Sequence, residues 1–257
     1  MVLLTPSQTA TLRDWFVPDQ PGPLVGLHVL QTGNGACFAD RWPHPRAVLT
    51  DIAGNYALTG KPDALIPDHL RRRITGFVDA PARFVPLLQA TFSSVRVWER
   101  VIFALETAPR FSFPKGLLIR RLALADTYNL WGLSPEVAWI GTTWGSPTGL
   151  ATSGYAWGAF AEGCLVSVAC TFFVGQAYED IGVVTEPEWR GWGLSVACAG
   201  ALCEDIQARG RRPSWSTAPE NTASVRVAEK LGFAVQRRDC LYVVGSSVPE
   251  PAHRQVA

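Results

Sequence analysis

The sequence lacks the patterns that mark several classes of protein. Its six cysteines include no CxxC pair, and no histidine stands at zinc-finger spacing from any of them, which argues against metal binding. No uninterrupted apolar run reaches about 18 residues, and the first residues contain neither a basic segment nor a long apolar one. We therefore expect no metal, no membrane span and a reducing, cytoplasmic location, with most cysteines as small core residues.

A large charge of either sign is also missing. The chain has 23 basic and 22 acidic residues, a formal net charge of +1. This balance provides no strong field for attracting nucleic acid or an anionic membrane, so we expect neither as a partner. The longest basic run, Arg71-Arg72-Arg73, is typical of the solvated face of a helix.

Apolar residues, in contrast, are plentiful. Hydrophobic residues make up 47% of the chain and ten of its residues are tryptophan, which predicts a folded protein with a sizeable core. The 257 residues exceed the usual domain size of about 100 to 150 residues. A stretch at 110–116 with Phe, Pro and Gly breaks the pattern. We predict a smaller α/β N-terminal domain at 1–115, a second domain at 116–245 and a flexible tail at 246–257.

The N-terminal domain alternates short helical and strand-like segments. Helices are predicted at Pro67 to Thr75 and Pro81 to Phe92, and strands at Arg46 to Ile52, Tyr56 to Leu58 and Val95 to Leu105. The second domain begins with strand candidates at Leu117 to Leu124, Tyr155 to Ala161, Leu165 to Val174 and Ala177 to Thr185.

The hydrophobic period then changes from two residues to about four. The residues Leu194, Cys198, Leu202 and Ile206 recur at helical spacing, and Gly210 stands where a helix often ends. A strand at Pro213 to Ala218, a helix from Asn221 to Gly232 and a strand at Asp239 to Val244 follow. A strand, a helix and a strand form a crossover that joins parallel strands and opens a cleft at their carboxyl ends. We predict an α/β (α+β) fold with a mixed sheet flanked by helices.

The most informative segment connects the strand that ends at Thr185 to the helix that begins near Leu194. The first N–H groups of a helix lack internal partners and carry partial positive charge, which suits a diphosphate. Gly191 and Gly193 let the backbone turn tightly and approach a ligand. Taken alone, this pattern is a weak signal and is more often an ordinary strand-to-helix turn.

Two motifs together give the segment a more specific meaning. Arg190-Gly191-Trp192-Gly193-Leu194-Ser195 resembles the acetyl-CoA loop of the GNAT superfamily, Arg/Gln-x-x-Gly-x-Gly/Ala, from which Ser195 departs although it is small. Asn221-Thr222-Ala223-Ser224 and Val227-Ala228-Glu229-Lys230-Leu231-Gly232-Phe233 resemble its downstream helix. The stretch Pro213-Ser214-Trp215 through Phe233, with Asp180-Ile181-Gly182 and Thr185, is similar to a GNAT subgroup that includes the zwittermicin-resistance acetyltransferase.

The resemblance covers roughly 140–244 and implies a mixed sheet whose fourth and fifth strands splay apart around the cofactor. It implies that backbone groups of Val183, Val184 and Thr185 bind the pantetheine arm. It also implies that Arg190, Gly191, Trp192, Gly193, Leu194 and Ser195 hold the diphosphate, with Asn221 and Ser224 across the cleft. Trp189, Trp192 and Trp215 could line an acceptor or adenine surface, although packing is the commoner role of such aromatic residues.

Amine acetylation requires a base, because an alkylamine with a pKa near 10 is mostly protonated at neutral pH. Glu179 and Asp180 begin the strand beside the expected thioester, and at most one can face the cleft, since neighbouring strand residues point to opposite faces. The subgroup resemblance favours Asp180; the alternative is a carboxylate in solvent or paired with arginine. Ala228 stands at the position of the tyrosine general acid of many GNAT enzymes. Ser224, Tyr155 or Tyr242 could donate a proton instead, but nothing in the sequence chooses among them, so we assign no general acid.

We therefore predict an N-acetyltransferase that uses acetyl-CoA and no metal to acetylate a primary amine by direct transfer in a ternary complex. The amine could belong to a small molecule or a protein, and the chain could act as a monomer or a homodimer. One alternative is a non-catalytic acyl-CoA-binding or sensing protein. Another is an acyltransferase for a longer acyl-CoA.

Overall fold

The structure is a computed structural model that describes residues 1–16 and 19–249. Its described residues form one mixed sheet of twelve strands in the order β1-β2-β3-β4-β5-β12-β6-β11-β10-β9-β8-β7. The strands are β1 (Val2–Leu3), β2 (Ala36–Ala39), β3 (Ala47–Ile52), β4 (Asn55–Gly60), β5 (Gly76–Asp79), β6 (Val95–Ala104), β7 (Leu118–Arg121), β8 (Ala156–Ala161), β9 (Cys164–Val174), β10 (Tyr178–Thr185), β11 (Arg212–Thr217) and β12 (Ala234–Val244).

Helices connect these strands. The α-helices are α1 (Pro6–Ala10), α2 (Val25–Thr32), α3 (Pro67–Arg71), α4 (Val85–Thr91), α5 (Thr127–Trp131), α6 (Pro147–Thr152), α7 (Leu194–Ala208) and α8 (Thr222–Leu231). The short 3-10 helices are η1 (Arg13–Phe16), η2 (Pro62–Ala64), η3 (Ala82–Phe84), η4 (Leu124–Asp126), η5 (Ala138–Trp144) and η6 (Pro187–Trp189).

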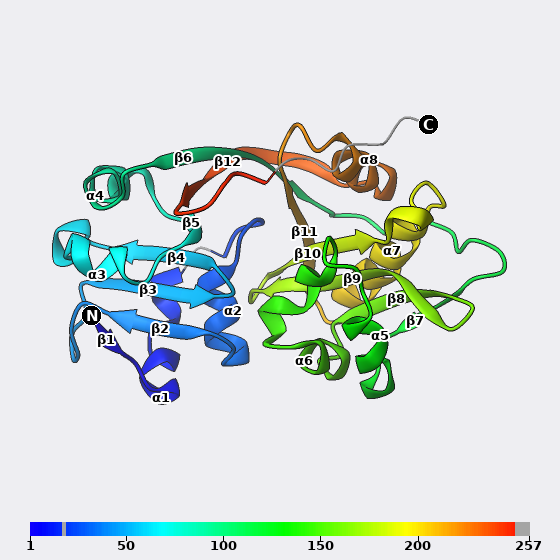
Figure 1. Ribbon diagram of the computed structural model, residues 1–257, viewed down its shortest axis with the longest axis horizontal. Helices are drawn as coiled ribbons and strands as arrows, with labels where there is room; N and C mark the ends of the chain where they lie inside the picture. The colour runs from blue at the N-terminus through cyan, green and yellow to red at the C-terminus, as the bar shows by residue number, and fades with distance from the viewer. Residues whose placement is uncertain (17–18, 250–257) are drawn as a thin grey trace.

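Two halves lie side by side in the molecule (Figure 1). The N-terminal half comprises β1–β5 with α1–α4, and the C-terminal half comprises β7–β11 with α5–α8. The long strands β6 and β12 run across both and pair along their length. β12 also pairs with β5, and β6 pairs with β11. The strand at 95–104 therefore lies inside the sheet next to strands from the C-terminal half.

The predicted mixed sheet and its helices are confirmed. The periodic segment from Leu194 forms α7, and its four periodic residues are at most 1% exposed in the core against the sheet. Asn221 caps α8, and Gly232 ends that helix with a φ of +99°. Four cysteines are buried, and all six are free thiols.

Several boundaries differ from the prediction. The helix predicted over 67–75 ends at Arg71, because the chain must turn before β5 begins at Gly76. The last strand begins at Ala234 instead of Asp239, since β6 supplies a long partner for pairing. β7 ends at Arg121, followed by η4. Residues 250–257 of the predicted tail lie outside the described residues.

The parallel strands β10 and β11 pair only briefly. Tyr178–Asp180 lie opposite Arg212–Ser214, and the pairing stops there although both strands continue. A bulge between Asp180 and Ile181 disturbs the register of β10 on β9 at the same place. β11 meanwhile pairs with β6 through Ser214–Thr217. The two strands therefore splay apart after Asp180, as the sequence resemblance implied.

Candidate functional site

The glycine loop, residues 190–193, leads from η6 into α7. Gly191 and Gly193 have φ angles of +89° and +78°, in the left-handed region that favours glycine. A Cβ at either position would meet no atom within 4 Å, so the loop is open on that side. The N–H of Ala197 donates to the carbonyl of Gly193 at 3.1 Å. The N–H groups before Ala197 have no carbonyl partner within the helix, as at any helix start. They can therefore donate to an anion.

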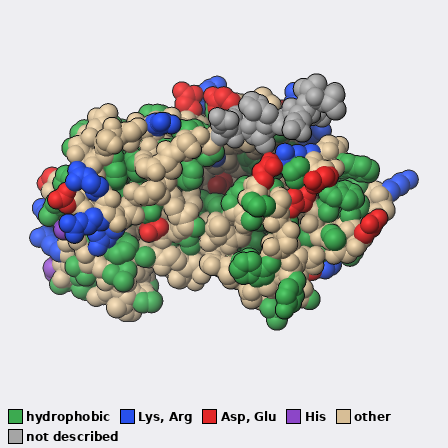
Figure 2. Space-filling view, in the orientation of Figure 1, with side chains coloured by type: hydrophobic (Ala, Val, Ile, Leu, Met, Phe, Trp, Pro, Cys, Tyr) green, Lys and Arg blue, Asp and Glu red, His purple; other side chains and the backbone are tan. Residues whose placement is uncertain are grey.

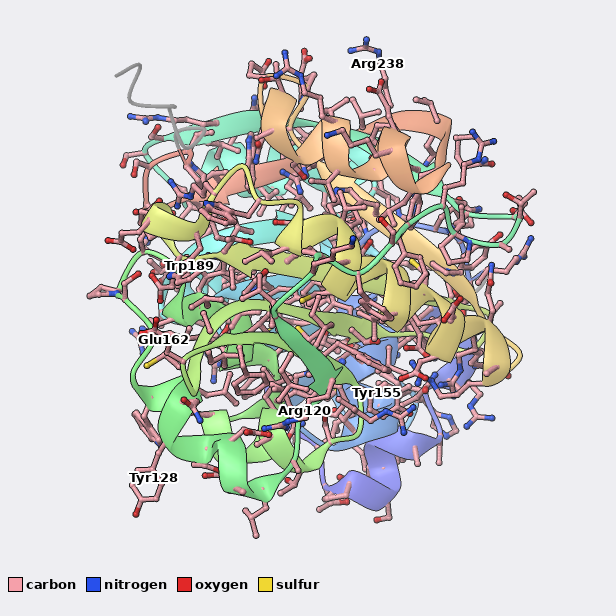
Figure 3. The ribbon with its side chains drawn as sticks, turned by 90° about the vertical axis from the view of Figure 1, so that its right-hand side faces the viewer. Arg120, Tyr128, Tyr155, Glu162, Trp189 and Arg238 are labelled. Atoms are coloured by element: carbon pink, nitrogen blue, oxygen red, sulfur yellow. The ribbon has the colours of Figure 1, made fainter. Side chains whose placement is uncertain are left out.

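Arg190 ties the glycine loop to its surroundings. Its guanidinium pairs with Glu136, and its Nε donates to the carbonyl of Thr185 at 3.3 Å. Trp192 is 62% exposed beside the loop, and its ring centroid is 5.8 Å from that of Trp189. Trp189 lies well away from Tyr155 in Figure 3. Trp215, in contrast, is buried against Phe233 and has a packing role.

Ser195 joins α7 to β10 through a chain of hydroxyl groups. Ser167 Oγ donates to the carbonyl of Val184 at 2.8 Å. Because a hydroxyl has one hydrogen, Thr185 must donate to Ser167, and Ser195 to Thr185, each across 2.7 Å. This chain gives a physical reason for serine at a position where the family pattern has glycine or alanine.

Val183 and Val184 follow the point at which β10 and β11 part. They lie opposite Ala169 and Val168 of β9 on one edge. The register with β11 ends at Asp180, so the other edge of this segment has no strand partner among the described residues. Backbone groups on that edge are available to a ligand.

The N-terminus of α8 follows β11, the strand on the other side of the opening. Asn221 Oδ1 accepts from the N–H of Ser224 at 3.1 Å, and Ser224 Oγ accepts from Trp215 Nε1 at 2.9 Å. Both side chains therefore help to order the start of α8, directly after β11. Ala228, one turn further on, is fully buried in the core.

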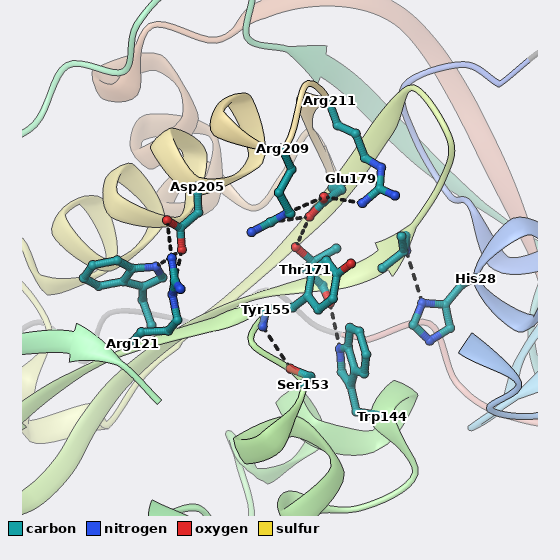
Figure 4. A network of polar contacts seen from close by, with 12 residues as sticks. His28, Arg121, Trp144, Ser153, Tyr155, Thr171, Glu179, Asp205, Arg209 and Arg211 are labelled. Carbon is teal, nitrogen blue, oxygen red and sulfur yellow. Dashed lines mark hydrogen bonds and ion pairs between the residues drawn. The ribbon is translucent and has the colours of Figure 1, made fainter. Parts of the chain in front are cut away.

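Glu179 is completely buried and lies in an ion-pair network (Figure 4). Arg209 donates to its two oxygens at 3.0 and 2.7 Å, and Arg211 donates at 3.0 Å. Thr171 Oγ1 donates a fourth hydrogen bond at 2.5 Å. These contacts gather at the C-terminal end of α7. A carboxylate with four donors is occupied as a structural anion, so we do not carry Glu179 forward as a base.

Asp180 has a different environment. Its side chain is 6% exposed, and Ser214 Oγ donates to Oδ1 at 3.0 Å. Burial raises the pKa of Asp180 to about 7, while the Ser214 hydrogen bond and the charges of Arg100 and Arg237 act in the opposite direction. A carboxyl with a pKa near neutrality can accept a proton at physiological pH.

Charged side chains surround the strand positions near Asp180. Arg100 on β6 donates to the carbonyl of Ser216 at 2.7 Å and lies 4.2 Å from the Trp98 ring centroid. Arg237 on β12 pairs with Asp239 at 2.9 Å. Figure 2 shows a hollow in the surface between the two halves, with acidic side chains inside it.

Sequence reasoning missed Ser214, Arg100 and Arg237 as neighbours of Asp180. Arg100 and Arg237 are 80 and 57 residues away from Asp180 in the sequence. Only the strand order of the sheet brings them together. Ser214 stood within the quoted motif, but nothing in its type indicated a bond to Asp180.

Tyr155 and Tyr242 do not lie at the glycine loop. Tyr155 lies 4.6 Å from the guanidinium of Arg209, at the far end of a helix about 22 Å long. Tyr242 lies opposite Val78 of β5. Among the described residues, no group of three or more His, Cys, Asp or Glu side chains is arranged to hold a metal ion. No helix in residues 1–16 and 19–249 has the length and apolarity to cross a membrane.

Comparisons with known proteins point to one family. Residues 125–242 match the family model "GNAT acetyltransferase". An uncharacterized N-acetyltransferase in the mutA 5'region of Streptomyces virginiae is 41% identical over 212 residues, covering 81% of this chain and 90% of that protein.

Solved structures share the fold over nearly the whole chain. A GCN5-related N-acetyltransferase-like protein from Streptococcus suis has a TM-score of 0.70 at 18% identity, covering 93% of this chain and all of that one. A tandem GNAT protein from the clavulanic acid biosynthesis pathway has a TM-score of 0.58 at 15% identity, with 96% and 99% covered.

Proposed function

Since the chain belongs to the GNAT acetyltransferase family, we propose that it transfers an acetyl group from acetyl-CoA to a primary amine. The transfer is direct, within a ternary complex of protein, acetyl-CoA and amine. The observation that carries this proposal is the parting of β10 and β11 at Asp180. It opens the sheet beside a carboxyl whose pKa burial has raised to about 7.

The N-terminus of α7 supports the proposed diphosphate site. The glycine loop is open, and the free N–H groups and partial positive charge of the helix start suit an anion. Arg190 would exchange part of its pairing with Glu136 for the diphosphate. The unpaired edge of Val183–Thr185 would bind the amide groups of the pantetheine arm, with Asn221 and Ser224 on the opposite side.

Asp180 would act as the base. Its carboxylate accepts a proton from the substrate ammonium, which leaves a neutral amine. The amine nitrogen then forms a bond to the acetyl carbonyl carbon, and a backbone N–H near Val183 or Val184 donates to the developing oxyanion. The carbon–sulfur bond breaks, the thiolate of coenzyme A leaves with the electron pair, and the remaining extra proton on the nitrogen passes to this thiolate, which gives a neutral amide and a neutral thiol. A thiol with a pKa of about 8.5 can leave in this way without a dedicated acid.

A calorimetric titration with acetyl-CoA, followed by a thiol-release assay against a panel of amines, tests the proposal. We expect micromolar binding and amine-dependent release. Binding without release from any amine would favour a sensor, an alternative motivated by the buried Ala228 at the usual tyrosine position. Competition by longer acyl-CoA donors would identify a different acyl preference. A protein that binds no acyl-CoA would overturn the proposal.

The proposed cellular setting is the cytoplasm. The six cysteines are free thiols, which suits a reducing compartment. The proposed partners are acetyl-CoA and an amine of a small molecule or a protein, so the proposed reaction requires neither a membrane nor a nucleic acid.

A further inference from the structure

Residues 19–22 of the N-terminal half contact the turn before β10 and residues within β11 and β12. The carboxylate of Asp19 accepts from the N–H of Ala177 at 2.7 Å and from the N–H of Gln176, in the turn that leads into β10. The carbonyl of Pro21 accepts from Arg237 Nη1 at 2.6 Å. These bonds fasten the segment to the turn before β10 and to β12.

The same segment reaches Asp180 through one intermediate side chain. The N–H of Gly22 donates to Ser214 Oγ at 3.4 Å, and Ser214 Oγ donates to Asp180 Oδ1 at 3.0 Å. Ser214 is fully buried, so no water competes for its hydroxyl. Because a hydroxyl has a single hydrogen, the bond from Gly22 occupies an acceptor position and directs that hydrogen toward Asp180.

We propose that residues 19–22 and Ser214 position Asp180, so that the N-terminal half completes the active site of the C-terminal half. Ser214 is a positioning residue that holds Oδ1 and leaves Oδ2 to face the amine. Gly22 in turn holds Ser214. This inference rests on the proposed role of Asp180 as the base.

Among the described residues, two arginines are the charged groups that act on Asp180. Arg100 extends from β6, and Arg237 extends from β12, where Asp239 and the carbonyl of Pro21 hold it. Burial raises the pKa of Asp180, and the hydrogen bond from Ser214 lowers it ahead of both arginines. Loss of the Ser214 hydroxyl should therefore raise the pKa further, because the charged form loses a donor.

Gly22 has little room for a side chain and a backbone conformation that favours glycine. Its φ is +127°, and an added Cβ would lie 3.1 Å from Arg237 Nη2 and 3.5 Å from Ile102 Cδ1. A larger residue would strain the backbone and displace either the segment or Arg237. The segment can thus be perturbed from the N-terminal half without touching Asp180 itself.

The first experiment measures kcat/KM against pH for the full-length Ser214→Ala variant. We expect the acid limb of the profile to move to higher pH by about one unit, with the KM for acetyl-CoA unchanged. Ser214→Thr keeps the hydroxyl and should return the limb toward that of the parent protein. An acid limb that stays in place in Ser214→Ala would overturn the inference.

The second experiment compares Gly22→Ala with a matched control. Gly33 belongs to the same half and has a φ of +71°, but a Cβ there would meet no atom within 4 Å. We expect Gly22→Ala to lower kcat by tenfold or more, on the order of the loss that a misplaced group causes, without changing acetyl-CoA affinity. Gly33→Ala should keep the parent kcat. Equal kcat values for the two variants would contradict the inference.

The Asp180→Asn variant separates this inference from the proposed function. If Asp180→Asn transfers acetyl groups at the parent rate, the assignment of the base fails and the inference fails with it. If Asp180→Asn is slow but Ser214→Ala and Gly22→Ala behave like the parent protein, only the positioning role fails.

Discussion

Among single residues, Asp180 links reactivity to stability. Its pKa rises from 3.8 to about 7 on burial, so the folded protein retains this proton more strongly than the unfolded chain does. The carboxyl therefore destabilises the fold progressively as the pH rises from about 4 to about 7, a loss of as much as about 4 kcal/mol. Such a loss of stability is expected of a residue that is retained for catalysis and not for stability.

The Asp180→Asn substitution should slow acetyl transfer by about 10²- to 10⁴-fold and flatten its pH dependence. It should also increase the free energy of unfolding at pH 8, because the amide carries no charge to bury. Steady-state kinetics and urea denaturation measure the two effects. An unchanged transfer rate would remove the proposed base.

Glu179, in contrast to Asp180, should stabilise the fold. Removal of this carboxylate in Glu179→Ala leaves Arg209, Arg211 and Thr171 without their shared partner, at a cost of about 3–5 kcal/mol. Asp68→Ala breaks an exposed pair with Arg71 and should cost less than about 1 kcal/mol. Urea denaturation compares the two variants. A Glu179→Gln protein that keeps its stability but loses transfer would instead indicate a catalytic Glu179.

The residues of the glycine loop could be identified from the sequence, because glycine spacing and the following helix are local. The environment of Asp180 could not. Strand pairing brings its partner Ser214 and the arginines Arg100 and Arg237 close to it. The identities of single residues do not predict that pairing. The choice between Glu179 and Asp180 likewise required the positions of Arg209 and Arg211.

At the level of elements, the start of α7 is the feature to test. Gly193→Glu would place bulk and negative charge where a diphosphate is proposed to bind, and we expect acetyl-CoA affinity to fall at least 100-fold, about 2.7 kcal/mol. Gly210→Glu is the matched control, since Gly210 has a φ of +75° and equally open space beyond the other end of α7. Calorimetric titration measures both. Equal affinities would remove the loop from the proposed cofactor site.

Elements with a strong period were predictable, whereas short ones were not. α7 and α8 have clear apolar spacing and end signals, and β8–β10 have turn residues between them. β2 and β5 have four residues each, too few for a strand period to stand out. The sequence indicated the first residues of β12 only weakly, since most of them are exposed or half-buried, and pairing with β6 extends that strand.

For the whole molecule, His28 provides a test of how the halves are joined. This buried residue of α2 has its Nε2 2.9 Å from the carbonyl of Thr143, and its Nδ1 accepts from the N–H of Val174 at 3.1 Å. Figure 4 shows His28 beside the C-terminal half. Burial lowers its pKa from 6.5 to about 4, against the effect of the Thr143 bond.

The folded protein therefore keeps His28 neutral while the unfolded chain takes up a proton below pH 6.5. The contribution of His28 is complete above that pH and is lost as the pH falls toward 4. Between pH 7 and pH 5 the parent protein should lose about 2 kcal/mol of stability through this residue. His28→Asn should lack that part of the loss, whereas His44→Asn, at an exposed site, should keep it. Identical pH dependences for all three proteins would contradict this role.

The arrangement of the whole sheet was beyond sequence reasoning. The second half could be assigned a mixed sheet, because its strand and helix order is local and matches a known family. Nothing local indicates that Val95–Ala104 lies between β11 and β12. That position depends on contacts between residues more than 100 apart in the chain, such as Ala104 with Ser214.

The interleaving of β6 with β11 and β12 also sets a constraint on biosynthesis. During translation, the segment that becomes β6 leaves the ribosome long before the residues of β11 and β12 exist. Its edges stay unsatisfied until the chain is nearly complete, because pairs of high sequence separation form late. An emerging chain should therefore resist proteases only after residue 244 has left the ribosome. Neither half should fold first as an independent unit.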